Sequence, residues 1–595
     1  MRPGKSGMTL TVLFAAIAVV SARAENGKPQ RLTPPEVWRD YDAEAGEFHE
    51  EVLKRWSEKG ADYKEVYFSA YVSGHTVRVY GIYAAPQGAR PVPAVMHLHG
   101  GGQTVNHEWL AAWTARGYAC LSCNYHGVWP DRERYTLYPR GLQQGNHRLK
   151  GDKEMATTPT VRESSWYIWT TVARRALSYL RQQAEVDRER VGVFGISMGG
   201  TTIWSLAMDP RLKAACAIYG CGWNRYYRYL PKYGPPGKMP EMTEADRVWI
   251  AGMAPEAYPP YIKCPVLFLS GTNDSHGNMD RAYDTLARLP KNVAGRQAFT
   301  PRYVHHIGAD FERDLTLWMD AWLKGGPAWP KSPVAKMSLG PDGVPAITVT
   351  TDKPREVEQV STYYAVENPR VVSRNWRNAG VVQTAGDWRA ALPVMHADKY
   401  LFAFANVRYK SGIHLSSNQE AVIPASLGKA KATDAPSLVL YDGSDGTGMW
   451  ATESPGTDPI PGQMLVLIHP ARGPRGKPGF TLDPYGTPWT LQPGDPKWRA
   501  PAGAALSFDV ATTTGEKFTV TMNEDYRWSG EAVYEARVVL QGQPGWQTVT
   551  LMAADFKERK EGCALAGFER CEILQLGGVW KDKKIVFTNF RWVRK

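Results

Sequence analysis

The sequence predicts an α/β fold, a mostly parallel sheet with helices on both faces, followed by two all-β sandwich or jelly-roll units. Two observations carry this prediction. Up to about residue 323, buried apolar runs alternate with helical segments, which is the pattern of a parallel sheet with crossover helices. Beyond residue 330, short alternating runs are separated by turn residues instead. A chain of 595 residues is also long enough for three such units.

The α/β unit is expected over residues 25–328. Its apolar runs have the length of buried strands, and its longer segments have helical periodicity. In chain order we predict a helical segment near Pro35–Lys59, hairpin-like strands at Tyr67–Val72 and Val77–Ala84, strands at Val92–Leu98 and Tyr118–Tyr125, a helix at Trp166–Gln183, strands at Arg190–Phe194, Leu212–Tyr219, Pro265–Ser270 and Arg296–Pro301, and a closing amphipathic helix at Ala309–Leu323.

The motif Gly195-Ile196-Ser197-Met198-Gly199 stands between an apolar run and a segment of helical pattern. Glycines around a serine permit the strained backbone of a strand-to-helix turn, because they have no side chain to obstruct it. Such a turn exposes the serine Oγ above the sheet, and the positive end of the helix lies beneath a developing oxyanion. Ser197 is therefore the candidate nucleophile, provided that its chemical partners are present; without them the motif is a packing turn.

Candidate partners follow two later strands. Gly271-Thr272-Asn273-Asp274 comes after the strand at 265–270, and Tyr303-Val304-His305-His306 comes after the strand at 296–301. A serine hydroxyl becomes a good nucleophile when a neutral imidazole takes its proton, and a carboxylate fixes the tautomer of that imidazole. We predict Asp274 as the acid, with Asp280 as a weaker alternative further from its strand end. His305 and His306 are both candidates for the base.

The segment His99-Gly100-Gly101-Gly102-Gln103 follows the strand at 92–98. Glycines here let backbone N–H groups approach a substrate oxygen closely, which supplies one half of an oxyanion hole. The N–H of Met198, directly after the nucleophile, supplies the other half. The predicted oxyanion hole therefore consists of Met198 with Gly101, Gly102 and Gln103.

With these four motifs in this order, residues from about 63 to 329 resemble the dienelactone hydrolase and acetyl xylan esterase branch of the α/β-hydrolase superfamily, which is related to the prolyl oligopeptidase catalytic domain. The resemblance implies Ser197 as nucleophile, Asp274 as acid and His305 as base. In this branch the base often stands in a Pro-x-x-x-His pattern, which Pro301 to His305 fits. His306 fits almost as well by position and remains the alternative base.

Two inserted loops, at about 126–160 and 222–260, are rich in aromatic residues, and loops of this kind carry substrate choice. Aromatic faces stack on sugar rings and arginine pairs with carboxylates, so the loops suit a decorated glycan. The equally good interpretation is a lid packed by its own aromatics. The residues named for a possible substrate loop are Tyr125, His126, Trp129 and Trp223; the loops also hold Tyr135, Tyr138, Arg140, His147, Tyr226, Tyr227, Tyr229 and Tyr233.

Proline and glycine at 324–330 mark a linker. We predict a small β-sandwich at 332–424 and a jelly-roll-like β unit at 434–595, the latter loosely resembling carbohydrate-binding modules. Cysteines 120, 123, 216 and 264 are expected to be buried thiols, and export would permit a bridge between Cys563 and Cys571. The candidate sugar platforms, of which we expect two or fewer to be functional, are Trp450, Trp489, Trp498, Trp528, Trp546 and Trp580.

The first 24 residues read as a signal peptide. Arg2 and Lys5 precede the apolar stretch Met8–Val20, and Ala22-Arg23-Ala24 has the small residues of a cleavage site. We therefore expect an exported protein, secreted or periplasmic, without a membrane span. Removing the three basic residues of the peptide lowers the formal charge from +12 to +9. This charge is dilute, and no nucleic-acid signature accompanies it, so nucleic acid is not an expected partner.

The sequence thus predicts an exported serine esterase that removes acetyl groups from a polysaccharide, and its chemistry requires no metal and no cofactor. Three alternatives remain open. A prolyl oligopeptidase-type peptidase is one, although only about forty mature residues precede the first strand expected here, too few for the propeller of that family. A glycan-binding surface protein with a vestigial hydrolase unit is another, and a polyester or lactone hydrolase is the third. The particular ester and the oligomeric state are not predicted.

Overall fold

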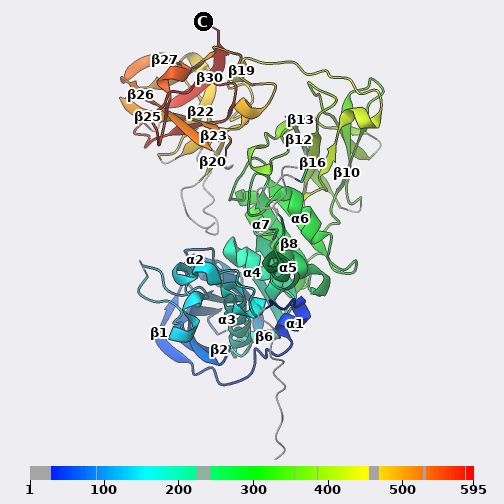
Figure 1. The fold of residues 1–595 in the computed structure, drawn as a ribbon, viewed down its shortest axis with the longest axis vertical. Helices are drawn as coiled ribbons and strands as arrows, with labels where there is room; N and C mark the ends of the chain where they lie inside the picture. The colour runs from blue at the N-terminus through cyan, green and yellow to red at the C-terminus, as the bar shows by residue number, and fades with distance from the viewer. Residues whose placement is uncertain are drawn as a thin grey trace, which may run out of the picture.

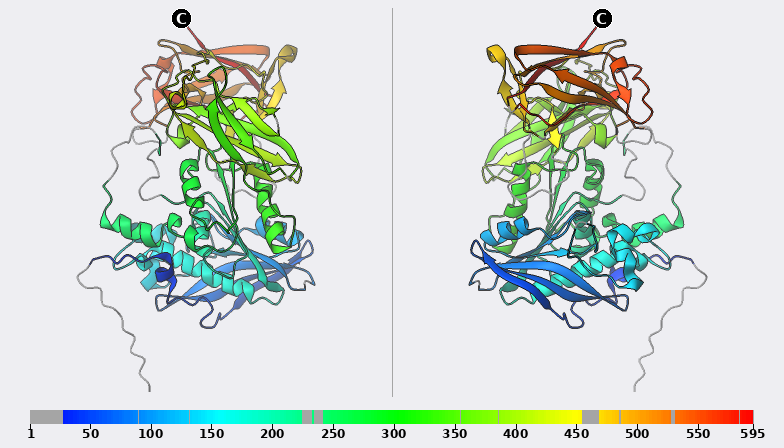
Figure 2. Two further views of the ribbon diagram at one scale, coloured as in Figure 1. Left: turned by 90° about the vertical axis from the view of Figure 1, so that its right-hand side faces the viewer. Right: turned by 90° about the vertical axis from the view of Figure 1, so that its left-hand side faces the viewer.

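The computed structural model describes residues 28–594, apart from 89, 131, 224–231, 234–240, 354, 385, 454–467, 485, 527–530 and 583. The expected signal peptide lies outside the described residues, as do Tyr226, Tyr227, Tyr229 and Trp528 of the sequence predictions. Figure 1 shows the first unit in blue to green, with two β-rich units beyond it. In both views of Figure 2 the second unit lies between the first and the third.

A nine-stranded sheet in the order β1-β2-β3-β5-β4-β6-β7-β8-β9 forms the first unit. Strands β1 to β3 and the β3–β5 pair are antiparallel, whereas all pairs from β5 through β4 to β9 are parallel. The nine strands are β1 (Glu51–Glu58), β2 (Ala61–Val72), β3 (His75–Pro86), β4 (Val92–Leu98), β5 (Ala119–Asn124), β6 (Val186–Ile196), β7 (Ala214–Ile218), β8 (Val266–Gly271) and β9 (Gly295–Thr300).

Helices cover both faces of this sheet. One apolar cluster contains Ile168 of α3 and Trp204 of α4, and a second cluster contains Trp109 of α2 and Trp318 of α7. Strands with helices on both faces are buried on both sides, as β5, β7 and β8 are throughout. The predicted α/β-hydrolase fold is confirmed. The helices are α1 (Pro34–Trp38), α2 (His107–Ala115), α3 (Ser165–Arg181), α4 (Met198–Leu206), α5 (Glu244–Gly252), α6 (Met279–Leu286) and α7 (Ala309–Leu323).

The helical segment expected near Pro35–Lys59 is wrong for most of its length. Only α1 is helical, and Glu51–Glu58 forms strand β1 on the outer edge of β2. In this pairing Trp56 lies opposite Tyr63, and the two rings stack with their centroids 5.1 Å apart. A cross-strand aromatic pair stabilises a sheet edge, so tertiary pairing overrides the local preference that suggested a helix.

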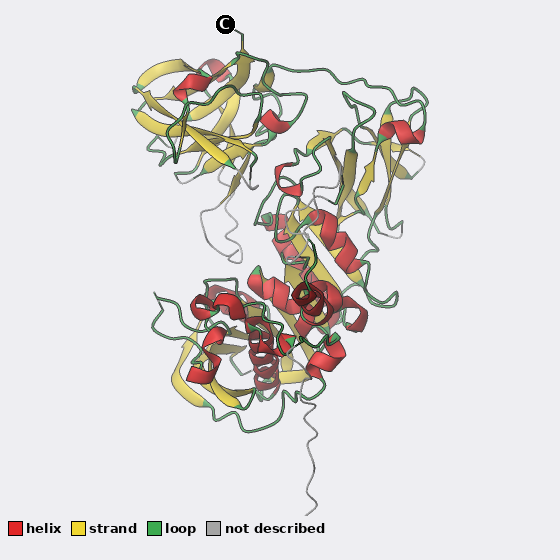
Figure 3. Cartoon of the chain, in the orientation of Figure 1, coloured by secondary structure: helices red, strands yellow, loops and turns green. Residues whose placement is uncertain are grey.

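All-β structure follows α7, as predicted, and Figure 3 shows only short helical turns there. The second unit has a four-stranded sheet, β10-β11-β15-β14, and a five-stranded sheet, β13-β12-β16-β17 with β18 on β16. Its strands are β10 (Val334–Leu339), β11 (Pro345–Thr350), β12 (Val357–Val366), β13 (Arg377–Ala379), β14 (Val382–Thr384), β15 (Asp387–Ala391), β16 (Leu401–Tyr409), β17 (His414–Ser416) and β18 (Glu420–Val422).

The third unit consists of two six-stranded sheets, β21-β22-β30-β24-β27 with β19 on β30, and β20-β23-β29-β25-β26-β28. All of its strand pairs are antiparallel. The strands are β19 (Val439–Tyr441), β20 (Ala451–Glu453), β21 (Ile468–Arg472), β22 (Pro478–Leu482), β23 (Thr487–Thr490), β24 (Ala505–Thr512), β25 (Glu516–Glu524), β26 (Ala532–Leu540), β27 (Gln543–Leu551), β28 (Lys557–Glu558), β29 (Cys571–Gly577) and β30 (Val586–Val593).

The units differ in how they share their cores. Both apolar clusters of the first unit continue into the second, whereas the third unit has a cluster of its own.

Among the candidate sugar platforms, Trp450, Trp489, Trp498 and Trp580 are buried in the third unit, and Trp546 is half-buried. All seven cysteines are described and carry free thiols, so the bridge considered between Cys563 and Cys571 is not formed. Over the described residues, no helix combines the length and apolarity that crossing a bilayer requires.

Candidate active site

Ser197 occupies the turn between β6 and α4. Its backbone has φ 55° and ψ −112°, a conformation that residues with a side chain rarely adopt. Two hydrogen bonds fix the turn: the N–H of Ser197 donates to the carbonyl of Ile218 at 2.8 Å, and its own carbonyl accepts from the N–H of Thr201 at 2.9 Å. The strained turn expected from the sequence is therefore present, and it is held by neighbouring backbone.

Glycines allow this turn to pack closely. A β-carbon on Gly199 would lie 2.2 Å from the carbonyl oxygen of Leu98, and one on Gly200 would lie 2.3 Å from that of Ile218. Both distances are far shorter than a van der Waals contact, so any larger residue would push α4 away from β4 or β7. The glycines thus set how closely the Ser197 turn approaches the ends of these strands.

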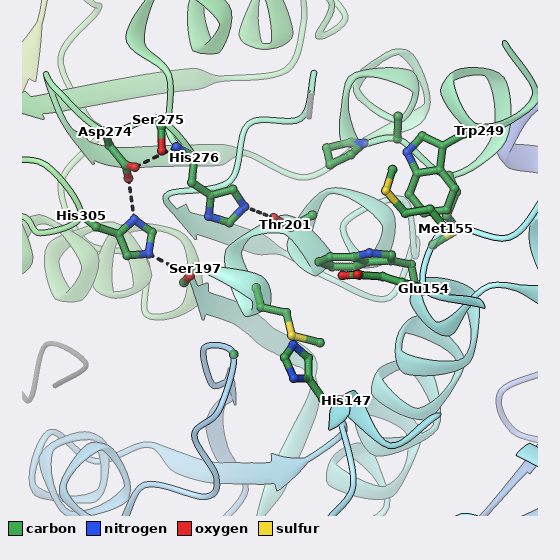
Figure 4. A pocket seen from close by; sticks show the side chains of 16 residues that line it. His147, Glu154, Met155, Ser197, Thr201, Trp249, Asp274, Ser275, His276 and His305 are labelled. Carbon is green, nitrogen blue, oxygen red and sulfur yellow. Dashed lines mark hydrogen bonds and ion pairs between the residues drawn. The ribbon is translucent and has the colours of Figure 1, made fainter. Parts of the chain in front are cut away.

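The structure brings the three predicted catalytic side chains together. Nε2 of His305 lies 2.8 Å from Oγ of Ser197, and Nδ1 of His305 lies 2.8 Å from Oδ2 of Asp274 (Figure 4). Asp274 is 1% exposed, whereas His305 is 40% exposed at the pocket. Burial alone would raise the pKa of Asp274, but His305 and hydrogen bonds to the carboxylate hold this pKa below its ordinary value. Asp274 is accordingly an anion beside the imidazole.

The alternative residues lie elsewhere. Asp280 forms a buried ion pair with Arg374, with N–O distances of 3.0 and 3.1 Å, and accepts a hydrogen bond from Gln419 at 2.7 Å. His306 follows His305 in the loop after β9, and the hydrogen bond to Ser197 is made by His305. The geometry therefore favours Asp274 and His305, while their catalytic roles stay predictions.

A second histidine, which the sequence reasoning did not single out, adjoins the triad. The N–H of His276 donates to Oδ1 of Asp274 at 2.8 Å, and its Nε2 lies 2.9 Å from Oγ1 of Thr201. Its ring lies 5.7 Å from that of His305. The backbone of His276 thus holds Oδ1 of the carboxylate, while His305 contacts Oδ2. Its position two residues after Asp274 was the available signal.

The loop after β4 lies beside the nucleophile. A β-carbon on Gly101 would lie 3.7 Å from Sδ and 3.9 Å from Cβ of Met198, so the two segments are in contact next to Ser197. The N–H of Met198 belongs to the first turn of α4, where helical N–H groups lack a partner within the helix. The N–H of Gly102 instead donates to Nε2 of His126 at 3.2 Å, and that of Gln103 to the carbonyl of Gly100 at 3.3 Å. Gly101 and Met198 are thus the better placed pair for an oxyanion.

Tyr125 and His126 are buried beneath this loop and do not line the pocket. The hydroxyl of Tyr125 donates to the carbonyl of His99 at 2.8 Å. Burial holds the pKa of His126 well below its ordinary value, which keeps its imidazole neutral and able to accept from Gly102. Both residues, expected to contact substrate, support the oxyanion loop in this structure.

The two tryptophans named with them also lie outside the pocket lining. Trp129 covers Gly102, where a β-carbon would lie 2.9 Å from the indole, and it stacks with Arg148 at 5.4 Å. The indole N–H of Trp223 donates to Oγ1 of Thr285 at 2.8 Å. Both tryptophans therefore contact neighbouring protein groups and not the pocket.

The pocket above Ser197 has a volume of about 570 Å³. The first inserted loop contributes His147, Glu154 and Met155, and α5 contributes Trp249, which Figure 4 shows across the pocket from His305. The ammonium of Lys150 lies 2.7 Å from Oε1 of Glu154 and 3.3 Å from Nε2 of His147. Burial and this ammonium lower the pKa of His147. The wall facing the triad therefore combines aromatic surface with a charge-compensated polar cluster.

Comparison with known families places two overlapping models on the first unit. Residues 22–229 match the acetyl xylan esterase family (AXE1), and residues 174–325 match the prolyl oligopeptidase family. Among curated proteins, dipeptidyl-peptidase 5 of Porphyromonas gingivalis is 24% identical over 258 residues, which are 39% of this chain and 34% of that protein. The chain thus spans about a third of the length of this curated relative.

Several solved structures are similar to the first unit. The acetyl xylan esterase of Paenibacillus sp. R4 is 18% identical with a TM-score of 0.38, covering 50% of this chain and 97% of that one. Acetyl xylan esterase 1 of Thermoanaerobacterium sp. JW/SL YS485 is 17% identical with a TM-score of 0.36, covering 49% and 95%. The first unit thus has an α/β-hydrolase fold, and the segments that match the acetyl xylan esterase and prolyl oligopeptidase families overlap at residues 174–229.

Proposed function

We propose that the protein is an exported serine esterase that removes acetyl groups from a polysaccharide. The observation that carries this proposal is a pair of hydrogen-bond contacts of 2.8 Å, one from Asp274 Oδ2 to His305 Nδ1 and one from His305 Nε2 to Ser197 Oγ. A triad of this geometry beside a pair of backbone N–H groups is the arrangement that acyl transfer requires. The match of residues 22–229 to the acetyl xylan esterase family supports the ester as substrate.

The reaction follows from the geometry. Oγ of Ser197 attacks the ester carbonyl carbon while Nε2 of His305 takes the hydroxyl proton. The N–H groups of Met198 and Gly101 hold the oxyanion, and Asp274 stabilises the imidazolium. When the tetrahedral intermediate collapses, the C–O bond to the sugar breaks and the sugar oxygen receives the proton from His305. Water then attacks the acetyl-enzyme by the same route, which releases acetate and restores Ser197.

The wall of the pocket supports a carbohydrate as the leaving group. Trp166 and Trp249 line it, and aromatic faces stack on the C–H faces of sugar rings. Glu154 offers carboxylate oxygens that accept hydrogen bonds from hydroxyl groups, and its charge is balanced by Lys150. Because this carboxylate is already paired, the hydroxyl groups of a neutral polyol can hydrogen-bond to the wall without bringing a counter-charge. The proposal that the protein is exported is supported by residues 1–24, whose sequence has the pattern of a signal peptide.

The test is release of acetate from acetylated xylan by the protein without residues 1–24. We expect release, and a fall of about 10⁴-fold or more in the Ser197→Ala variant. Ser57→Ala, a surface serine whose hydroxyl donates to Asp62, is the matched control and is expected to behave as wild type. Cleavage of a small aryl acetate without release from xylan would retain the triad and reject the polysaccharide. Inertness towards both would favour a glycan-binding protein with a vestigial site.

A serine peptidase is the second candidate function, because the prolyl oligopeptidase region spans residues 174–325 and therefore all three triad residues. A dipeptidyl peptidase of this kind must bind the N-terminal ammonium of its substrate, and an unpaired carboxylate is the usual partner of an ammonium. Of the described carboxylates that line the pocket, Asp274 pairs with His305 and Glu154 pairs with Lys150. We therefore expect aryl acetates to be cleaved and dipeptidyl p-nitroanilides to be left intact. Faster cleavage of the anilides would reverse this assignment.

A further inference from the structure

A buried segment of the second unit touches the loop that carries Asp274. Residues 370–378, called the clip from here on, run from the 3-10 turn Val371–Ser373 into β13, and all residues from 371 to 377 are buried. The side-chain amide of Asn273, directly before Asp274, donates to three clip carbonyls: those of Val371 at 3.1 Å, Val372 at 3.4 Å and Arg374 at 2.8 Å. The loop after β8 that carries Asp274, called the acid loop from here on, is thus fixed to the clip through Asn273.

The same clip holds the loop after β9 that carries His305, called the base loop from here on. Nε of Arg302 donates to the carbonyl of Trp376 at 2.9 Å, and one terminal nitrogen donates to Oδ1 of Asn378 at 2.6 Å. The other terminal nitrogen donates to the carbonyl of Gly448 in the third unit at 3.2 Å. Arg302 has φ +66°, a strained value for a residue with a side chain, so its contacts hold a turn that local preference disfavours.

Arg302 also joins the two loops to each other. Its N–H donates to Oγ1 of Thr272 at 2.8 Å, and that hydroxyl donates to Oδ1 of Asn273 at 2.8 Å. The N–H of Asn273 in turn donates to the carbonyl of Tyr303 at 2.9 Å. The acid loop, the base loop and the clip therefore form one hydrogen-bonded network around the Asp274–His305 pair.

The third unit fixes the clip from the other side. Asp495 accepts from Asn375 at 2.9 Å and from Nε of Arg377 at 2.8 Å, and Asp434 accepts from Arg377 at 2.7 Å. The third unit also covers the base loop directly. Val304 is fully buried in a small apolar cluster with Ala451, Trp489, Leu491 and Ile573.

We propose that the clip and the third unit set the positions of Asp274 and His305 relative to Ser197, with Arg302 and Asn273 as positioning residues for the proposed hydrolysis. The inference rests on the proposed function of the triad. It gives the β units a role inside the reaction, in addition to any contact with substrate. A displacement of about 1 Å at a reacting group costs about 10²-fold in rate, so small shifts of either loop are sufficient.

The test uses the full chain without residues 1–24 and a p-nitrophenyl acetate assay. We expect Arg302→Ala to lower kcat by about 10- to 100-fold with KM nearly unchanged, because the substrate pocket is lined by other residues. Arg302→Lys, which retains one donor, should recover part of the loss. Asn378→Ala removes one partner of Arg302 at an exposed position and should give a smaller loss. Arg408→Ala, which breaks a surface pair with Glu358, is the matched control.

A pH profile separates positioning from loss of folded protein. Around the imidazole of His305 lie Asp274, His276 and Tyr219. If His305 moves away from Asp274, less negative charge stabilises the protonated imidazole, and the acid limb of kcat/KM shifts to lower pH. A variant that merely unfolds in part would lose amplitude without such a shift. Thermal unfolding of each variant shows whether it folds, and Asn378→Ala provides the answer if Arg302→Ala does not.

The outcomes are distinct. A lowered kcat, a shifted acid limb and partial recovery in Arg302→Lys support the clip. Wild-type kcat and pH profile in Arg302→Ala and Asn378→Ala, while Ser197→Ala is inactive, would overturn the clip and leave the proposed function intact. Full turnover by Ser197→Ala would overturn both, because no triad would remain for the clip to position.

Discussion

The two halves of the site are held in different ways. Ser197 and the oxyanion pair lie within residues 99–200 and are fixed by the ends of the central strands, through the carbonyls of Leu98 and Ile218. The loops that carry Asp274 and His305 are fixed by residues about 70 to 270 positions further along the chain, in two other units. One half is therefore built by the α/β unit alone, and the other depends on the β units.

This difference separates what each half does in the reaction. The nucleophile half binds the acyl group and the oxyanion, so its geometry must be rigid against the sheet. The acid–base half moves one proton between Ser197 and the leaving group, and it responds to small displacements of two loops. Attachment of those loops to separate units makes proton transfer sensitive to how the β units dock.

The largest effect is expected where the nucleophile half is packed most tightly. In Gly199→Ala the new methyl group would lie 2.2 Å from the carbonyl oxygen of Leu98, so the turn cannot retain its geometry. We expect esterase activity to fall by at least about 10²-fold together with a lower unfolding temperature, measured by an aryl acetate assay and calorimetry. Gly380→Ala, with no atom within 4 Å of the added carbon, is the control. Retained activity in Gly199→Ala would show that the turn is not rigid.

A smaller effect is expected when the oxyanion loop is loosened. His126→Ala removes the acceptor of the Gly102 N–H, which lies next to Gly101. We expect kcat to fall by about tenfold, because one oxyanion donor is displaced and not lost. The pH profile should stay in place, in contrast to Arg302→Ala, since the Asp274–His305 pair is untouched. A shifted acid limb in His126→Ala would contradict the separation into two halves. His396→Ala, which breaks an exposed pair with Glu367, is the matched control.

The smallest effect concerns docking of the second unit against α7. Burial raises the pKa of Asp314 to about 6. The nearby His414 lowers this pKa, but by less than burial raises it. The folded chain thus holds this proton more tightly than the unfolded chain, so the free energy of unfolding falls as the pH rises from about 4 to 6. Well above pH 6 the buried carboxylate is charged, and the folded protein bears the full free-energy cost of burying that charge.

Asp314→Asn removes that cost. We expect it to stabilise the protein at pH 7 by about 1–3 kcal/mol, with no gain below pH 4, as measured by denaturant unfolding across pH. Asp310→Asn, on the exposed side of the same helix, is the control. A gain that persists at pH 4 would mean that charge burial is not its cause.

Much of the first unit could be predicted, because its signals are contiguous. Gly195 to Gly199 encode the turn around Ser197 within five residues, and α7 was predicted with the bounds that it has. Strand β1 was missed because its stability comes from pairing with β2, as in the stacked Trp56 and Tyr63, and not from its own sequence.

The clip could not be predicted from local patterns. Asn273 and Arg374 are about a hundred residues apart, and nothing in either segment indicates the other. Tyr125, His126 and Trp129 were expected near substrate because aromatic residues in a loop suit sugars and cores equally well. Only burial and hydrogen bonds identify Tyr125 and His126 as supports of the oxyanion loop, and only its packing on Gly102 identifies Trp129 as one.

The most direct test of Ser197 as the nucleophile is reaction of the full chain with a fluorophosphonate, followed by mass spectrometry and an aryl acetate assay. Oγ of Ser197 would attack phosphorus, fluoride would leave, and His305 would take the proton. We predict one label per chain, on Ser197, with activity lost in proportion to labelling, and slower labelling in Arg302→Ala. Turnover that persists in fully labelled protein, or a label on another residue that accounts for the loss, would contradict this prediction.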